Sequence, residues 1–378
     1  MDDIKMLALT QGAPFSKNTY SGTTFGVLTG LKKKGILVAA EDVEPELFIR
    51  KALNAVGSFS FNKEKWRQKY VRSDGRFNYC SKKAARVIND QRSDVNCVLQ
   101  MGALFSPLSS AGSLPPVISY HDSNIALSAK GGVHSFSSLV SSSIIQKRFK
   151  MESDIYHGND LILTFSDYVK RSMVEDFGVS EEKIKVVYAG SNLEKMIIAE
   201  NKSYDENVIL FVGKDFERKG GKVVLEAFQK IKKSVKDVKL IILGADIEVA
   251  DPAVEVYGFV DKNTQGGEEL INEIYQRASV FVMPSFFEPF GIVFCEAMFH
   301  KLPCVGSNIC AMPEIVKDGE SGFLIEPGNS TQLAEKVIEI LLDKKLAHDL
   351  GHKGYEIAHD RFTWDRVADR VVDAISAL

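Results

Sequence analysis

Short apolar segments alternate with longer amphipathic ones along almost the whole chain. The first apolar segment covers residues 4–9, and an amphipathic segment at 23–34 follows it and stops before Gly35. Short apolar runs are typical of buried strands, and the 3.6-residue period is typical of helices. The repeated strand–helix alternation predicts an α/β protein built on parallel sheets.

The same pattern of apolar runs and amphipathic segments predicts the remaining strands and helices. In the first half it predicts strands at 95–100, 117–121, 161–166 and 184–188 and a helix at 168–177. In the second half it predicts strands at 208–212, 240–243, 254–260, 280–284 and 304–306, with helices at 221–231 and 291–301. The alternation lapses in a polar stretch at 191–207. We therefore predict two doubly wound domains in tandem, with ligands at the carboxyl ends of the strands and a shared cleft between the domains.

Composition narrows the class of protein. No run of eighteen apolar residues occurs, which excludes a membrane-spanning helix, and the acidic start Met1-Asp2-Asp3 is unlike an export signal. Five cysteines without a Cys-x-x-Cys pair favour buried thiols in a reduced compartment and argue against structural zinc. We expect a cytoplasmic protein, or one bound peripherally at the inner face of the membrane.

The charge is unevenly distributed. Residues 51–150 hold 15 Lys and Arg against 5 Asp and Glu, whereas the whole chain has a formal charge of −3. The segment 63–70 mixes cations with Trp66 and Tyr70. Two interpretations stay open: contact with an anionic membrane, a lipid-diphosphate acceptor or an acidic glycan, or an ordinary solvated helix face. Nucleic acid is disfavoured, because the net charge is negative and no recognition motif is present.

Two carboxylates eight residues apart mark the most informative segment. Glu288 lies in a loop after a predicted strand, and Glu296 lies inside the helix that begins near Gly291. The amides at the start of that helix, including those of Gly291 and Ile292, are suited to a diphosphate, and a glycine allows its close approach. The alternative is structural, with Glu288 as a helix cap and Glu296 on the surface.

A basic turn follows the predicted strand at 208–212. It begins at Gly213 and carries Lys214, Arg218 and Lys219 before two further glycines. Neither a Gly-x-Gly-x-x-Gly nor a Gly-Lys-Ser/Thr pattern is present, which disfavours a nicotinamide oxidoreductase and leaves the cations to hold phosphate groups. A solvated basic loop is the competing interpretation.

Two positions in the first half are weaker candidates. Gly22 lies in the loop between the first strand and the first helix, where the backbone can contact a sugar or a phosphate. His121 ends the predicted strand at 117–121, so its imidazole is placed at a carboxyl strand end. A single histidine is more often structural than functional.

Together these segments resemble the family-4 retaining glycosyltransferases of GT-B fold. The family's E-x7-E motif is matched from Glu288 to Glu296, including the pair Phe290-Gly291, and further matches lie at 163–172, 183–192, 313–328 and 362–368. The resemblance implies an acceptor-binding domain at 1–195, joined by a C-terminal helix at about 363–378 that crosses back to it. It implies a nucleotide-sugar-binding domain at 205–362.

The resemblance also implies roles for individual residues. Glu288 would contact hydroxyls of the donor sugar, Glu296 the ribose, and the amides of Phe290 to Ile292 the sugar and the diphosphate. Lys219 would neutralise the diphosphate leaving group, and either Lys214 or Arg218 would replace an arginine that the family usually has after the glycine. His121 would lie near the anomeric centre, and Gly258, Phe259 and Val260 would border the base.

The implied reaction is transfer of a sugar from a nucleotide sugar to a glycan, lipid-linked or small-molecule acceptor, with retention of configuration. We expect the departing diphosphate to help accept the proton, with neither a metal nor a further cofactor, in glycan or polysaccharide biosynthesis. The alternatives are a nucleotide-sugar epimerase or a phosphorylase on the same fold, and a catalytically silent carbohydrate-binding subunit.

Overall fold

The computed structural model describes residues 4–55, 58–110, 114–193 and 202–378. They divide into two compact units, Met1–Ala189 with Trp364–Leu378, and Gly190–Thr363. The predicted end of the first domain at residue 195 and part of the polar stretch at 191–207 lie outside the described residues. Within the described part of the chain, no helix is both long and apolar enough to cross a bilayer.

The first unit is built on one parallel sheet with the strand order β2-β1-β3-β4-β5-β6. The strands are β1 (Met6–Thr10), β2 (Leu37–Asp42), β3 (Cys97–Met101), β4 (Val117–His121), β5 (Leu161–Thr164) and β6 (Ile184–Val186). β1, β3, β4 and β5 are buried along their whole length. The strand order reverses between β1 and β3, so these two strands form the switch point of this sheet.

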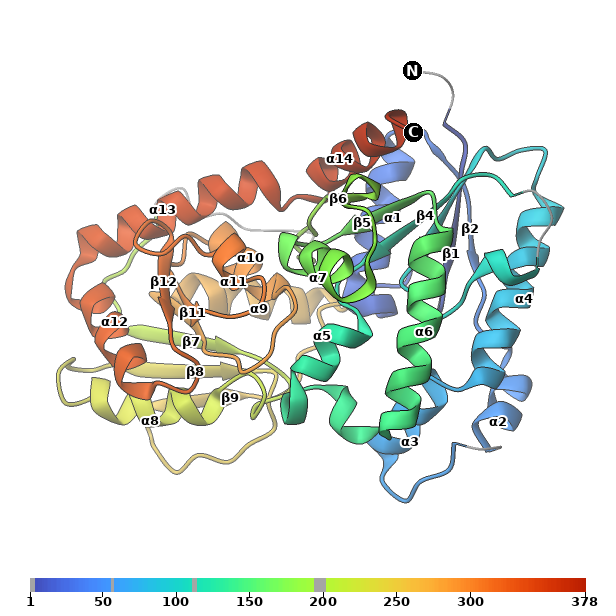
Figure 1. Cartoon of the computed structure of the whole chain (residues 1–378). Helices are drawn as coiled ribbons and strands as arrows, with labels where there is room; N and C mark the ends of the chain where they lie inside the picture. The colour runs from blue at the N-terminus through green and yellow to red at the C-terminus, as the bar shows by residue number, and fades with distance from the viewer. Residues whose placement is uncertain (1–3, 56–57, 111–113, 194–201) are drawn as a thin grey trace. The chain divides into compact units, whose positions relative to one another are not determined.

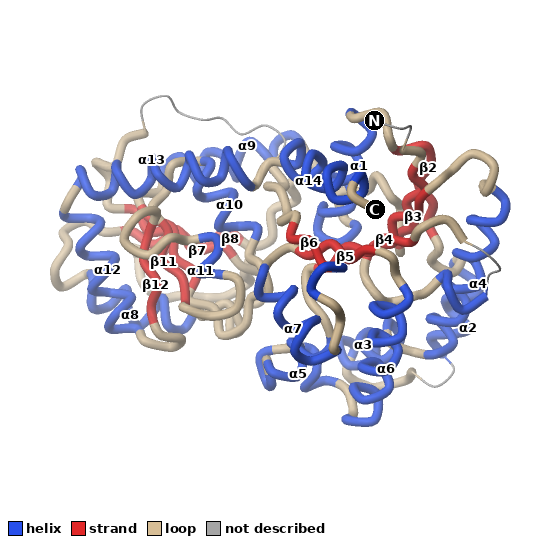
Figure 2. The backbone as a smooth tube through the Cα atoms, turned by 45° about the horizontal axis from the view of Figure 1, so that its top comes forward, coloured by secondary structure: helices blue, strands red, loops and turns tan. Residues whose placement is uncertain are grey.

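Helices cover both faces of the first sheet, with α1 and α14 on one side of the strands and α6 and α7 on the other (Figure 2). The α-helices of this unit are α1 (Thr23–Lys33), α2 (Leu47–Ala55), α3 (Lys63–Val71), α4 (Asp74–Asp90), α5 (Ile125–Lys130), α6 (Ser142–Gly158), α7 (Asp167–Phe177) and α14 (Trp364–Ser376). Short 3₁₀ helices lie at η1 (Thr19–Gly22), η2 (Pro107–Ser110), η3 (Gly132–His134), η4 (Phe136–Leu139) and η5 (Glu181–Lys183).

The C-terminal helix α14 packs on α1 at a surface where α1 has two glycines. A Cβ atom at Gly26 would lie 2.1 Å from Cε2 of Trp364, and one at Gly30 would lie 2.9 Å from the carbonyl oxygen of Trp364. Only bare backbone fits at this contact. Lys33 adds an exposed ion pair to Asp365 at 3.1 Å. The last helix therefore completes the first unit although it follows the second unit in sequence.

The second unit contains a parallel sheet with the strand order β12-β11-β10-β7-β8-β9. Its strands are β7 (Val208–Val212), β8 (Lys239–Leu243), β9 (Val254–Tyr257), β10 (Val280–Met283), β11 (Cys304–Ser307) and β12 (Gly322–Ile325). Its helices are α8 (Gly221–Ile231), α9 (Gln265–Arg277), α10 (Ile292–Phe299), α11 (Met312–Ile315), α12 (Ser330–Leu342) and α13 (Lys344–Arg361). α8 and α12 pack together on one face, and α10 packs with α13 on the other (Figure 1).

The two sheets confirm the predicted α/β class. The strands at 117–121 and 208–212 and the helix at 221–231 have the predicted bounds. The strand predicted at 254–260 ends at Tyr257, because Gly258 to Val260 form the loop that leaves the sheet. The edge strands β2 and β12 were missed, although each contains a short apolar run.

We expect Gly26→Ala to destabilise the first unit by roughly 1–3 kcal/mol, because the added carbon enters the Trp364 ring. Urea unfolding followed by tryptophan fluorescence measures this change. Gly266→Ala is the matched control: it lies in α9 with no atom within 4 Å of the new carbon, so it should leave stability unchanged or raise it. A Gly26→Ala protein as stable as the wild type would contradict this packing of α14 on α1.

Candidate functional site

Two loops meet at the switch point of the second sheet. β7 and β10 are neighbours in that sheet, although β8 and β9 separate them in sequence. The basic turn that begins at Gly213 leaves the carboxyl end of β7, and the loop that carries Glu288 leaves the carboxyl end of β10. In open α/β sheets the ligand binds at this point. The sheet order therefore brings together two segments that the sequence separates by about seventy residues.

Two hydrogen bonds and a close backbone approach hold the two loops against each other. The amide of Phe286 donates a hydrogen bond to the carbonyl of Arg218 at 2.9 Å, and Nη1 of Arg218 donates to the carbonyl of Phe287 at 2.6 Å. Gly220 has φ +79°, and a Cβ atom there would lie 2.0 Å from the carbonyl oxygen of Pro284. No other residue allows the backbones to approach so closely.

Glu288 is the charged centre of this junction. Its Oε2 lies 3.3 Å from Nη1 of Arg218 and 3.3 Å from Nζ of Lys219, and its side chain is only 12 % exposed. Burial works to raise the pKa of Glu288, but the charges of Lys219 and Arg218 outweigh burial, so the pKa lies below its ordinary value. Glu288 is therefore an anion between two cations.

Helix α10 begins beside this carboxylate. Its N-cap is Gly291, with φ +88°, and a Cβ atom there would lie 2.9 Å from Cε of Met312 and 3.3 Å from Cγ of Glu288. Phe290 is buried against Phe362, with ring centroids 5.9 Å apart. The capping residue is a glycine without a side-chain bond, so the structural alternative in which Glu288 caps the helix is wrong. The first turn of α10, starting at Ile292, offers its amides to an anion.

The second carboxylate has a different environment. Glu296 is 7 % exposed, so the alternative that placed it on the surface is also wrong. Its Oε2 accepts a hydrogen bond from the hydroxyl of Tyr275 at 3.2 Å. Burial raises the pKa of Glu296 above its ordinary value, and the charges of Lys262 and Lys219 and the Tyr275 hydroxyl offset this only in part. A carboxyl in this state is suited to hydrogen bonding with a hydroxyl group.

The remaining candidates of the second unit lie around the same strand ends. Gly213 follows β7, its amide donates to the carbonyl of Leu243 at 2.8 Å, and a Cβ atom there would meet Lys219. Gly258, Phe259 and Val260 follow β9. Lys214 is exposed, with its ammonium 5.2 Å from the centroid of the exposed Phe259 ring. Arg218, and not Lys214, contacts Glu288 in this structure.

In the first unit, His121 ends β4 and is 2 % exposed. Its ring lies edge-on to Tyr156 with centroids 5.1 Å apart, and its Nε2 has no hydrogen-bond partner among the described residues. Burial lowers the pKa of His121 to about 3, so the imidazole is neutral at physiological pH. Gly22 is the N-cap of α1, with φ +96°, and the preceding Tyr20 and Ser21 also have positive φ.

Several side chains that shape these sites were not predicted. Tyr275 lies on α9 and reaches Glu296 from a different helix, and Lys262 acts on the same carboxylate from the loop before α9. In the first unit, Arg148 is 2 % exposed and contacts the loop after β3. Each of these contacts joins elements distant in sequence.

Comparison with known proteins finds glycosyltransferases similar to the second unit. Residues 194–357 match the family model of glycosyl transferases group 1. The chain is 29 % identical over 238 residues to an uncharacterised glycosyltransferase of Methanocaldococcus jannaschii. It is 28 % identical over 221 residues to CapM, a capsular polysaccharide biosynthesis glycosyltransferase of Staphylococcus aureus. These matches cover 56 % and 53 % of this chain and 58 % and 57 % of the relatives, so the chain spans little more than half of their length.

The fold has a counterpart over the whole chain. Sucrose-phosphate synthase from Thermosynechococcus elongatus superposes with a TM-score of 0.75 over 99 % of this chain and 98 % of that chain. The identity is 18 %, so this likeness shows the fold and not the activity. The architecture is that of the GT-B fold. The match to the glycosyl transferases group 1 model covers less than half of the chain. The narrower assignment to family 4 stays a prediction.

His300 supports the Glu296 helix turn and makes stability depend on pH. Its Nδ1 lies 2.8 Å from the carbonyl oxygen of Glu296 and its Nε2 2.9 Å from Oδ1 of Asn272. Burial lowers the pKa of His300 to about 4. The unfolded chain, with an ordinary histidine pKa, takes up the proton first as the pH falls. The contribution of the neutral His300 side chain to the stability of the folded protein is therefore complete above about pH 6.5. It is lost as the pH falls toward 4.

We expect this one group to remove about 2 kcal/mol of stability between pH 7 and pH 5. The measurement is urea unfolding at both pH values for the wild type and for His300→Gln, whose amide does not titrate. His300→Gln should be less stable at pH 7 but lose less stability on acidification. An equal loss in both proteins would show that His300 is not held neutral by burial.

Proposed function

We propose that this protein is a glycosyltransferase that moves a sugar from a nucleotide-sugar donor to a glycan, lipid-linked or small-molecule acceptor in glycan or polysaccharide biosynthesis. The observation that carries the proposal is the junction at the switch point of the second sheet. There Glu288 lies between Arg218 and Lys219, beside the start of α10. The group 1 family match of residues 194–357 covers this junction.

The junction offers two cations to a diphosphate. Arg218 and Lys219 both pair with Glu288, and Arg218 also pairs with the exposed carboxylate of Asp215 at 3.1 Å. The start of α10 adds first-turn amides and a partial positive charge. A nucleoside diphosphate would draw on these groups, with Lys219 stabilising the leaving group, Lys214 adding charge from the exposed turn, and Arg218 in the place of the family's arginine.

The two carboxylates are suited to different parts of the donor. The ionised Glu288 can accept hydrogen bonds from sugar hydroxyls, and its position is set by the two cations. Glu296 lies deeper, against Tyr275, where a carboxyl can bind the ribose hydroxyls. Gly258, Phe259 and Val260 are the segment that we assign to the base. His121 contributes a neutral imidazole to the sugar-transfer step through its Nε2, which no described residue bonds.

In the proposed reaction the bond between the anomeric carbon and the diphosphate oxygen breaks as the acceptor oxygen forms its bond on the same face of the sugar. The acceptor proton passes to the departing phosphate oxygen. Positive groups at the junction stabilise the negative charge that develops on this oxygen. No nucleophile from the protein takes part, and we propose that no metal is needed.

The first test is a thermal-shift screen of nucleoside diphosphates and nucleotide sugars, because a ligand that binds the native state raises its apparent stability. We expect stabilisation by one nucleotide in the wild type and a loss of affinity of roughly tenfold in Glu296→Ala. Glu335→Ala, an exposed carboxylate on α12, is the control and should behave like the wild type. No shift from any nucleotide at saturating concentration would contradict a donor site.

The second test concerns the chemistry. With the donor that the screen identifies, we expect Glu288→Gln to lower kcat by about 10²–10³, the range found when a preorganised electrostatic contact is removed. The wild-type rate should be unchanged by a chelator. Proton NMR of the first-formed product should show the anomeric configuration of the donor. Inverted product, or activity that requires added divalent metal, would refute these parts of the proposal.

A further inference from the structure

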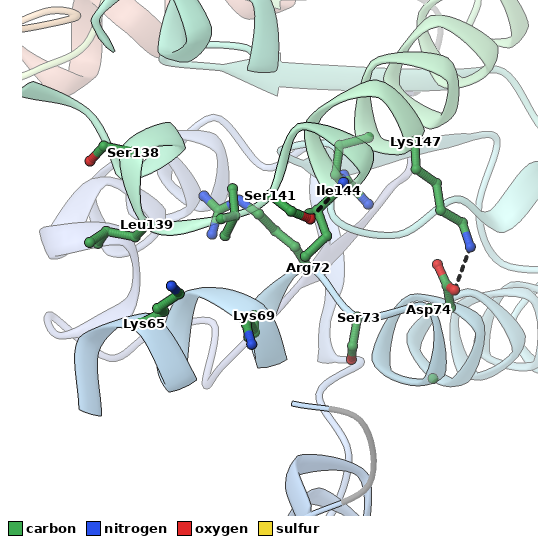
Figure 3. A pocket seen from close by; sticks show the side chains of 13 residues that line it. Lys65, Lys69, Arg72, Ser73, Asp74, Ser138, Leu139, Ser141, Ile144 and Lys147 are labelled. Atoms are coloured by element: carbon green, nitrogen blue, oxygen red, sulfur yellow. Dashed lines mark hydrogen bonds and ion pairs between the residues drawn. The ribbon is translucent and has the colours of Figure 1, made fainter. Parts of the chain in front are cut away.

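A strongly basic pocket lies in the first unit. It has a volume of about 580 Å³, within the size range of small-ligand sites. Lys65 and Lys69 of α3 lie along one wall, and the segment with Ser138, Leu139 and Ser141 lies opposite (Figure 3). The lining residues are Lys65, Lys69, Arg72, Ser73, Asp74, Gly75, Ser138, Leu139, Val140, Ser141, Ile144, Lys147 and Arg148.

The charge of this pocket is unbalanced. Its lining contains five cationic side chains and one carboxylate, Asp74, which is paired with Lys147. In the described part of the chain, no carboxylate lies within ion-pair distance of Lys65, Lys69 or Arg72. Cations that converge without a counter-charge repel one another and attract an anion.

Arg72 lies between the two walls (Figure 3). Its guanidinium stacks on the ring of Phe136 at 3.3 Å from the centroid, and its Nη1 donates to the carbonyl and the side-chain oxygen of Gln68. Burial, together with the nearby charge of Arg148, lowers the pKa of Arg72 to about 9. A partly buried guanidinium that no described carboxylate pairs with is costly to the free protein, and an anion in the pocket would lower that cost.

The buried side chain of Arg148 independently indicates that a ligand binds in this pocket. It is 2 % exposed, and its Nε has no hydrogen-bond partner among the described residues. Its Nη2 donates to the carbonyl of Ala103 at 2.6 Å and lies 3.6 Å from Oε1 of Glu152. Buried polar groups are normally bonded, so an unbonded donor on a pocket wall indicates an acceptor supplied from outside.

Two long helices begin at the rim of the pocket. Ser73 is the N-cap of α4 and Ser141 is the N-cap of α6, and both line the pocket. Each side chain satisfies one amide of its helix, which leaves other first-turn amides for a ligand. The two partial positive charges at these helix starts add to the field of the cations.

The pocket is linked to the carboxyl edge of the first sheet. Arg148 reaches Ala103, two residues after β3 ends, and Glu152 accepts the amide hydrogen of Ile125, in the segment after β4. The hydroxyl of Tyr156 donates to the same carboxylate at 3.0 Å, and its ring contacts His121. The pocket is therefore tied through one chain of contacts to the strand ends where ligands of such sheets bind.

We propose that this pocket binds the phosphate group of the acceptor, an inference that rests on the function proposed above. Lys65, Lys69 and Arg72 supply the charge, and Arg148 supplies a buried donor. Guanidinium and ammonium donors with helix-start amides are the groups that recognise a tetrahedral phosphate. The acceptor is thus a phosphorylated molecule, whether a soluble sugar phosphate or the phosphate of a lipid-linked glycan.

The test is calorimetric titration of the full chain with inorganic phosphate. We expect binding in the wild type and a loss of affinity of at least about tenfold in the double variant Lys65→Glu/Lys69→Glu, because both charges are reversed. The control is Lys51→Glu/Lys63→Glu, which changes the net charge equally at two exposed positions outside the pocket and should bind like the wild type. Equal loss in both double variants would overturn the proposal, as would no binding in the wild type.

The cations of the second unit can also bind phosphate, so the titration is repeated in a Lys219→Ala background. Binding that persists there and is lost when Lys65 and Lys69 are also reversed supports the pocket. Binding lost with Lys219→Ala alone overturns it. A protein that binds a nucleotide at Glu296 but no phosphate in the first unit refutes this inference and leaves the proposed function intact.

Vesicle binding distinguishes a lipid-linked phosphate from a soluble sugar phosphate. Pelleting with phosphatidic acid vesicles, but not with phosphatidylcholine vesicles, that is lost in Lys65→Glu/Lys69→Glu supports the pocket with a lipid-linked phosphate. Phosphate binding without pelleting supports the pocket with a soluble phosphate. Pelleting that Lys65→Glu/Lys69→Glu leaves unchanged, together with unchanged phosphate affinity, overturns the proposal.

Discussion

The ion cluster of Glu288, Arg218 and Lys219 is the interaction on which the second unit's site depends. It joins the loop after β7 to the loop after β10, and the close approach of Gly220 to the Pro284 carbonyl makes the cluster possible. Removal of a buried partner from such a cluster leaves charge without compensation, so the two loops are positioned together. Because the two cations lie beside the start of α10, we propose that this structural junction is also part of an anion site.

The two motif carboxylates show how environment separates residues of one type. Glu288 is surrounded by cations, which lower its pKa in spite of burial. Glu296 lies eight residues further on, inside a helix and against Tyr275, where burial raises its pKa. The spacing of Glu288 and Glu296 in the sequence does not distinguish the two carboxyl groups. Their different surroundings make one a fixed anion and the other a weaker acid, which suits them to different hydroxyl groups of one ligand.

The two units share a layered architecture, but their candidate sites lie at different places in it. In the second unit the site lies directly at the sheet's switch point, with cations from a turn and amides from α10. In the first unit the basic pocket lies among helices α3, α4 and α6, and Arg148 connects it to the loop after β3. The basic segment 63–70 is thus partly pocket wall, through Lys65 and Lys69, and partly an exposed helix face, through Lys63 and Arg67.

Local pattern alone was enough to predict the α/β class, most of the strands and the E-x7-E segment, because apolar periodicity and helix-start signals act over a few residues. Tertiary structure decided that Arg218 rather than Lys214 contacts Glu288, that Tyr275 bonds Glu296, and that Arg72 and Arg148 share a pocket. Each of these contacts joins residues on separate elements. Strand order, burial and side-chain direction set such contacts, and these are properties of the folded chain rather than of any local stretch of sequence.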